Sequence, residues 1–164
     1  MMVRNREKNF SKQKGSLMVE ILIVVSIITA SLLVALNVTQ KSIYLSRQSL
    51  NQSQVAFLLE EGAEAVRVRR DGAWANISGL TIGTNYYPFF SGGTWTLSTT
   101  PNTVGIFTRR IVVSSVYRDA NQDIASSGTL DAQTKLVTVT VSWVDAGQNL
   151  SKTLQFYISD IFSS

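Results

Sequence analysis

The 164-residue chain contains no cysteine and no histidine. The absence of cysteine excludes disulfides, thiolate metal sites, a cysteine nucleophile and a lipid anchor attached to cysteine. The absence of histidine removes the most common general base and metal ligand. Because the remaining residues offer no nucleophile or acid–base cluster, we expect a protein that is not an enzyme and uses no cofactor.

Net charge is also lacking over most of the chain. The formal net charge of +4 equals the balance of residues 1–15, where five basic residues stand against Glu7, since 5 − 1 = +4. The five are Arg4, Arg6, Lys8, Lys12 and Lys14. The rest of the chain carries ten basic and ten acidic side chains. A nucleic-acid-binding surface needs its basic residues on the folded body, so no direct nucleic-acid site is expected.

A long apolar run extends from residue 17 to residue 36, directly after the basic segment. About 20 apolar residues are needed to cross a bilayer core as a helix, so the run predicts one membrane-spanning helix. The preceding positive charge predicts an N-terminus in the cytoplasm and an exported C-terminal body. Glu20 interrupts the run. A carboxylate at that depth costs about 2.5–3.5 kcal/mol and is therefore a candidate functional residue.

Three interpretations of this segment are open. A cleaved secretory signal would end in a small-x-small site, and residues 30–37 offer no convincing one. An uncut signal anchor accounts for the hydropathy and the topology, but it leaves Glu20 unexplained. The third interpretation gives Glu20 a role and depends on the residues around it.

The string Lys-Gly-Ser-Leu-Met-Val-Glu at residues 14–20, followed by the apolar run, resembles the N-terminal signal of type IV pilins and type II secretion pseudopilins. The resemblance implies that a prepilin peptidase cuts between Gly15 and Ser16 and methylates the new N-terminus. Glu20 then becomes the fifth residue of the mature chain. Its carboxylate would pair with the Ser16 ammonium of its own chain or of a neighbour, offset the cost of both charges and set the register of assembly. Family members usually have an aromatic residue after the cut, and Ser16 departs from that pattern.

The resemblance also implies partners, location and function. The expected partners are the prepilin peptidase, the N-terminal helices of other pilin subunits, a pilus assembly platform with its ATPase, and the inner membrane. The subunit would lie in the bacterial cytoplasmic membrane before assembly and in a cell-surface filament afterwards. The function implied is that of a structural subunit of a type IV pilus or a related secretion or DNA-uptake filament. The absence of cysteine and the serine start favour a minor pilin or pseudopilin. The alternative is a signal-anchored extracytoplasmic binding protein that does not assemble.

Residues 37–71 contain no proline and are predicted to continue the helix to the Asp71-Gly72 pair. Two apolar stripes run along nearly opposite sides of this segment. One consists of Leu36, Ile43, Leu50 and Phe57, the other of Val38, Leu45, Leu59 and Val66. We expect one stripe to contact the chain's own sheet and the other to contact neighbouring helices. The alternative is a helix buried on all sides within a monomeric core.

The charged residues near the end of this helix are expected to form a solvated face. They are Glu60, Glu61, Glu64, Arg67, Arg69 and Arg70. Glu64 and Arg67 are three residues apart and should pair across one turn.

The C-terminal part is predicted to be a variable connecting region over 72–103 and an antiparallel sheet over 104–164. Three segments are predicted to be strands, 111–117, 137–143 and 153–158. Apolar and polar residues alternate in the last two, whereas both faces of 111–117 are mixed. Residues 145–149 separate the last two segments and predict a hairpin turn. The chain would thus consist of a cleaved leader (1–15), a membrane or filament-core helix (16–36), its amphipathic continuation (37–71) and this C-terminal part. The predicted fold class is α+β, with a long N-terminal helix packed on a small C-terminal antiparallel sheet, which is the pilin fold.

One loop has part of a calcium-binding pattern. Asp119, Asn121 and Asp123 supply alternating oxygen ligands, as at the start of an EF-hand loop. The sixth and twelfth positions hold Ile124 and Leu130 in place of glycine and glutamate. We therefore expect a polar loop between strands. Asp119, Asn121 and Asp123 are the candidates for a calcium site in it.

Overall fold

The computed structural model describes residues 7–161, with side chains from Ser16 onward. Its longest element is helix α1 (Glu7–Gly72), which ends where the Asp71-Gly72 pair predicts. The chain divides into two compact units, residues 1–50 and residues 51–164, and each is described by itself.

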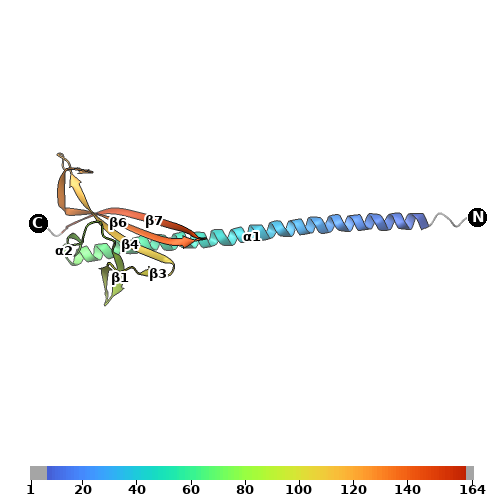
Figure 1. Ribbon diagram of the computed structural model, residues 1–164, viewed down its shortest axis with the longest axis horizontal. Coiled ribbons are helices and arrows are strands. Elements are labelled where there is room, and N and C mark those ends of the chain that lie inside the picture. The colour runs from blue at the N-terminus through green and yellow to red at the C-terminus, as the bar shows by residue number, and fades with distance from the viewer. Residues whose placement is uncertain (1–6, 162–164) are drawn as a thin grey trace, which may run out of the picture. The chain divides into compact units, whose positions relative to one another are not determined.

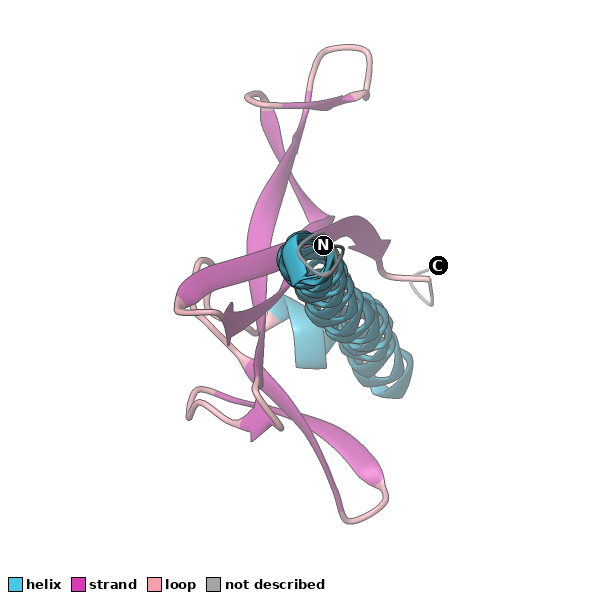
Figure 2. Cartoon of the chain, turned by 90° about the vertical axis from the view of Figure 1, so that its right-hand side faces the viewer, coloured by secondary structure: helices cyan, strands magenta, loops and turns pink. Residues whose placement is uncertain are grey.

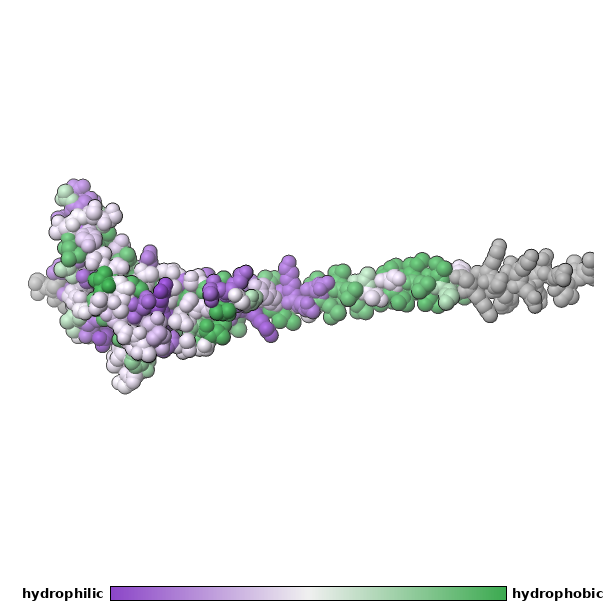
Figure 3. Space-filling view, viewed as in Figure 1, coloured by the Kyte–Doolittle hydropathy of each residue, from purple (hydrophilic) through white to green (hydrophobic). Residues whose placement is uncertain are grey.

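The described part of the first unit is helical throughout, and it exposes its apolar side chains (Figure 3, green). The apolar run also holds hydroxyl residues, and each donates to the backbone carbonyl four residues earlier, over 2.7 Å for Ser26, 2.8 Å for Thr29 and 2.8 Å for Ser31. Such bonds satisfy the hydroxyls inside the helix, so they do not need water. By length and composition this helix can cross a membrane.

The second unit combines the end of α1 with an antiparallel sheet and a separate hairpin (Figure 1). The short helix α2 (Ala75–Ser78) follows α1. The hairpin consists of β1 (Tyr87–Ser91) and β2 (Thr94–Ser98). The sheet has the order β3-β4-β6-β7, with β5 paired to β4. Its strands are β3 (Thr103–Val104), β4 (Phe107–Arg118), β5 (Ile124–Ala125), β6 (Thr129–Asp145) and β7 (Gln148–Ser159).

The three predicted strands and the hairpin turn are confirmed. On β6, the predicted inward residues Val137, Val139, Val141 and Trp143 are all buried. The turn between β6 and β7 has a two-residue loop, Ala146 and Gly147, with φ angles of 48° and 78°. Positive φ at both positions is the geometry of a type I′ turn, whose twist matches that of the flanking strands. Glycine adopts it without strain.

A β-bulge explains why residues 111–117 show mixed faces. The pairing of β4 with β6 shifts between Ser115 and Val116. Before the bulge Ile111 and Val113 are buried, and after it the parity changes and Val116 is buried. Ser115 pairs with Lys135 and the next residue, Val116, pairs with Asp131, so the extra residues, 132–134, lie on β6. The buried face of β4 changes where this irregularity interrupts the ladder. Beyond it, β4, β5 and the start of β6 form an arm, and Figure 2 shows this arm and the β1–β2 hairpin extending in opposite directions from the sheet.

The core of the second unit lies between the end of α1 and the inner face of the sheet. The helix contributes Val55, Leu58, Leu59 and Val66, and the sheet contributes Ile111, Val137, Val139, Val141, Trp143 and Ile158. The α+β class with a helix packed on an antiparallel sheet is therefore confirmed. In this unit Leu59 and Val66 belong to the covered stripe, whereas Phe57 of the other stripe is 73% exposed. Residues 51–72 are thus not enclosed on all sides.

Candidate functional site

The predicted assembly residue lies one helical turn after the predicted cleavage point. The Ser16 hydroxyl donates to the Glu20 carboxylate over 3.4 Å. Helical side chains tilt toward the N-terminus, so a glutamate reaches back to the residue four positions earlier. The helix therefore presents Glu20 where it can pair with a positive group at residue 16.

The surroundings of Glu20 are apolar. It is the one charged residue between Ser16 and Gln40. Its apolar neighbours Leu17, Ile21 and Val24 are each more than half exposed, so the structure supplies no protein environment for them. A lone carboxylate in such a segment is expensive in lipid unless it finds a partner, which fits a functional role and not a packing role.

The structure describes the leader residues only in part. Arg4 and Arg6 fall outside the described residues. For Lys8, Lys12, Lys14 and Gly15 only the helical backbone is described. The basic leader and the cut between Gly15 and Ser16 therefore stay predictions.

Arg109 connects the helix to several strands, and this role was not predicted. Its side chain is buried beneath the helix and forms an ion pair with Glu61. It also donates to the carbonyls of Leu58 and Pro88, each over 3.4 Å, and its guanidinium lies 5.4 Å from the ring centre of Trp95. One buried cation thus joins α1, β1, β2 and β4. The alternation of side chains along the strand could have predicted this burial, because Arg109 has the same parity as the inward residues around it.

This contact corrects part of the prediction for the charged helix end. Glu64 and Arg67 form the predicted pair, 3.5 Å apart and exposed. Glu61 does not belong to a purely solvated face, because it binds a buried arginine from the sheet. Arg67 also lies over the Phe156 ring, 5.3 Å from its centre. The face therefore holds the helix to the sheet as well as contacting water.

A glycine permits the close approach of helix and sheet at this point. A Cβ atom on Gly62 would lie 2.7 Å from Val139 Cγ1 and 3.1 Å from Arg109 Cδ. The first distance is too short for two carbon atoms, so any larger residue would push the helix away. Gly62 therefore sets how closely α1 and β6 pack.

A groove borders the same cluster on the outside of the second unit. It has a volume of about 740 Å³ and is lined by side chains from α1, β2 and β7. Phe57, Trp95 and Leu154 are its large apolar lining residues, here called the floor, and its charged lining residues, here called the rim, are Glu60, Glu61, Glu64 and Arg67. Among the exposed large apolar side chains of the described residues, Phe57 has the highest exposed fraction, 73%.

The predicted calcium loop is organised by its own backbone. The Asp119 carboxylate accepts hydrogen bonds from the backbone N–H groups of Asn121 and Asp123, over 2.8 and 3.0 Å. This is the geometry of an Asx turn. The described residues contain no group of three His, Cys, Asp or Glu side chains that could hold a metal ion. The polar loop between strands is therefore present, and calcium binding by the three candidates stays a prediction.

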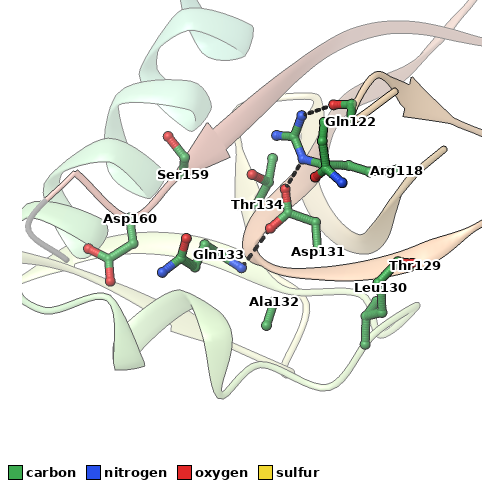
Figure 4. A pocket seen from close by; sticks show the side chains of 10 residues that line it. All are labelled: Arg118, Gln122, Thr129, Leu130, Asp131, Ala132, Gln133, Thr134, Ser159 and Asp160. Carbon is green, nitrogen blue, oxygen red and sulfur yellow. Dashed lines mark hydrogen bonds and ion pairs between the residues drawn. The ribbon is translucent and has the colours of Figure 1, made fainter. Parts of the chain in front are cut away.

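A second pocket, of about 640 Å³, lies beside this loop and contains an ion pair (Figure 4). Arg118 donates to the Asp131 carboxylate over 2.7 Å and to the Gln122 carbonyl over 2.7 Å. The backbone N–H of Gln133 donates to the other Asp131 oxygen over 2.9 Å. The Arg118 hydrogen bond is the main cause that holds the pKa of Asp131 below its ordinary value, with smaller help from Thr134 and Gln133 and against its partial burial. The pair ties β4 to β6 next to the bulge.

Comparison of the chain with protein-family models, with curated proteins and with solved structures finds no match in any of the three. The long apolar N-terminal helix followed by an antiparallel sheet resembles the pilin fold.

Proposed function

We propose that the chain is a type IV pilin-like subunit, a non-enzymatic structural component of a pilus or of a related secretion or DNA-uptake filament. The observation that carries the proposal is Glu20. It is the single charged residue between Ser16 and Gln40, in the exposed apolar stretch of the helix, and its carboxylate lies within reach of residue 16. A signal anchor needs the apolar helix, but it has no use for a carboxylate at that position.

Maturation would expose the partner of Glu20. The chain enters the cytoplasmic membrane with residues 1–15 inside, and a prepilin peptidase hydrolyses the bond between Gly15 and Ser16 and methylates the new amine. Removal of the leader changes the net charge from +4 to zero, since 4 − 4 = 0. The new Ser16 ammonium then lies at the positive end of the helix dipole, where the nearby carboxylate offsets an unfavourable charge.

Assembly would cover the apolar surface of the helix. Before assembly lipid contacts residues 17–36, and in the filament the helices of other copies replace that lipid. Lipid tails are as apolar as leucine, so this exchange is driven by packing and by the Glu20 pairing rather than by the hydrophobic effect. The resemblance to type IV pilins implies an assembly platform and an ATPase as the partners that extract the helix from the membrane. A repeated head-to-tail contact that does not close gives a filament.

The subunit is more consistent with a minor pilin or pseudopilin than with a major pilin. The chain has no cysteine for a disulfide-closed C-terminal loop, and its predicted mature N-terminus is serine instead of an aromatic residue. Purified filaments composed chiefly of this chain would contradict this narrower assignment.

The mature N-terminus tests the proposal. The chain is isolated from cells with and without an active prepilin peptidase, and the mass of its N-terminal peptide is measured. We expect a methylated Ser16 with the peptidase, and the intact precursor without it or in a Gly15→Val variant. Residues 1–15 still attached in cells with active peptidase would contradict the proposal and favour a signal-anchored binding protein.

Glu20→Gln separates processing from assembly. This substitution keeps the shape of the side chain but removes the charge, so cleavage should continue while the amount of chain in filaments falls by about tenfold or more. Thr29→Val is the matched control, because it removes a polar group from the same helix whose hydroxyl is satisfied internally. Equal incorporation of both variants would contradict the role given to Glu20.

A further inference from the structure

The groove beside Phe57 is an uncovered, partly apolar feature of the second unit. Phe57 is 73% exposed, and Trp95 and Leu154 are partly exposed on the same floor. Residues of the unit's own sheet already cover the opposite face of the helix. Nothing in residues 51–161 covers the groove, so its occupant must come from outside this unit.

The rim of the groove has a net negative charge, because Glu60, Glu61 and Glu64 line it together with the single cation Arg67. Glu60 makes no ion pair or hydrogen bond within the described residues, and Glu64 is paired only with the exposed Arg67. Glu61 is held from below by Arg109, which leaves it 44% exposed. An occupant with a positive charge flanked by apolar side chains would match this surface.

The chain itself contains such a segment. Between Ile21 and Leu59 the only charged residues are Lys41 and Arg47, and both are basic and exposed. Arg47 lies four residues after Ile43 and three before Leu50, so these three side chains share one face of the helix. The positive charge of Arg47 complements the acidic rim of the groove, and its apolar neighbours complement the apolar floor.

The same spacing recurs in the groove with the opposite charge. Phe57, Glu61 and Glu64 also have the spacing i, i+4 and i+7 along the helix. A shift of 14 residues places Ile43 beside Phe57, since 57 − 43 = 14. It also places Arg47 at the level of Glu61, since 61 − 47 = 14, with Glu60 and Glu64 on either side of it.

We propose that the groove binds residues 43–50 of a second copy of this chain, aligned in parallel and shifted by about 14 residues, with Arg47 against the acidic rim. The inference rests on the proposed function, because a shifted parallel contact repeats from copy to copy and builds a filament. The contact of Arg47 with the rim would fix the axial alignment of neighbouring copies by charge. It lies outside the membrane segment and is independent of the pairing at Glu20. A misaligned neighbour would bury Phe57 against polar side chains and leave the rim unpaired.

Charge reversal tests the contact in the full chain. Arg47→Glu should lower filament incorporation by about fivefold or more, because it places like charges together. Lys41→Glu is the matched control on the same segment, since its side chain points about 120° away around the helix. Glu60→Lys should have the effect of Arg47→Glu, and Asp145→Lys at the β6–β7 turn is its control. The double variant Arg47→Glu/Glu60→Lys should recover to within about twofold of the original chain.

The absence of cysteine allows a direct measurement of the register. In an Ile43→Cys/Phe57→Cys chain, mild oxidation should link copies into ladders, about tenfold more than in a Val38→Cys/Phe57→Cys control, because disulfides need close and aligned Cβ atoms. If the N-terminus is uncut or the chain enters no filament, the proposed function fails. If filaments form but Arg47→Glu equals Lys41→Glu and both cysteine pairs link equally, the register proposed here is wrong and the function stands.

Discussion

Helix α1 contains two stretches whose apolar side chains have opposite surroundings. In residues 16–50 the large apolar side chains are exposed, whereas Val55, Leu59 and Val66 in residues 51–72 are buried against the sheet. Helix propensity does not distinguish them, because both stretches lack proline and form regular helix. The difference lies in what covers each stretch. The second is completed by its own chain, and the first requires lipid or other copies.

The strongest test of this comparison uses the same substitution in both stretches. Val66→Asp places a charge without a partner in the core of the second unit, where valine is fully buried, and should cost about 3–5 kcal/mol of unfolding free energy. Val38→Asp is the control, since Val38 is 63% exposed, and it should change the stability of the second unit by less than about 0.5 kcal/mol. Denaturant unfolding of the full chain in detergent, followed by tryptophan fluorescence, measures the effect. All three tryptophans lie in the second unit. Equal effects of the two substitutions would contradict the division.

The contacts of Arg109 make the next largest contribution to the covered stretch. Arg109→Ala removes the ion pair with Glu61 and two hydrogen bonds to carbonyls, so we expect a loss of about 2–3 kcal/mol. The loss is smaller than for a fully buried pair, because the released Glu61 carboxylate can turn to water. Arg110→Ala on the opposite face of β4 is the control, with an expected loss below about 0.5 kcal/mol. A stability change confined to Arg110 would overturn the assignment.

Gly62 tests how closely the helix approaches the sheet. Alanine is the better helix former by about 1 kcal/mol, so Gly62→Ala would stabilise an uncovered helix. Here the added methyl group meets Val139, and we expect a net loss of about 1–2 kcal/mol. Ser53→Ala, at an exposed position of the same stretch, should gain a few tenths of a kcal/mol. Stabilisation by both substitutions, in the same unfolding assay, would show that the contact relaxes freely.

Much of this division could be predicted from periodicity alone. The helix over 37–71, the alternation on β6 and the hairpin at 145–149 depend on local pattern, and all three are present. The opposite-side stripes also predicted that the sheet covers one face of the helix end, but not which of the two stripes it covers. These features are local, because the period of the side chains determines which face they occupy.

The features that could not be predicted depend on contacts between distant segments. Arg109 and Glu61 are 48 residues apart, and charge alone assigned the glutamate to solvent. The bulge at Ser115 depends on the register with β6, which no single strand encodes. The processing site at Gly15 and Ser16 was inferred from a motif. The structure does not test it, so it stays a prediction.

The smallest expected effect concerns pH and again separates the two stretches. The hydrogen bond from Arg118 lowers the pKa of Asp131 in the folded unit, so the ionised carboxylate stabilises the fold above its ordinary pKa. That contribution is lost as the pH falls from about 5 through the lowered pKa. Asp131→Asn should therefore cost at most about 1 kcal/mol at pH 7 and flatten the fall in stability below pH 5.

Asp123→Asn is the control, because its exposed carboxylate makes no hydrogen bond within the described residues. Unfolding midpoints measured from pH 7 to pH 3 would decide between them. The helix of residues 16–50 should show no such dependence outside Glu20, since it contains no other carboxylate. A pH response of the fold that persists unchanged in Asp131→Asn would place the titrating group elsewhere in the second unit, and the Arg118 pair would then be a contact without measurable linkage to folding.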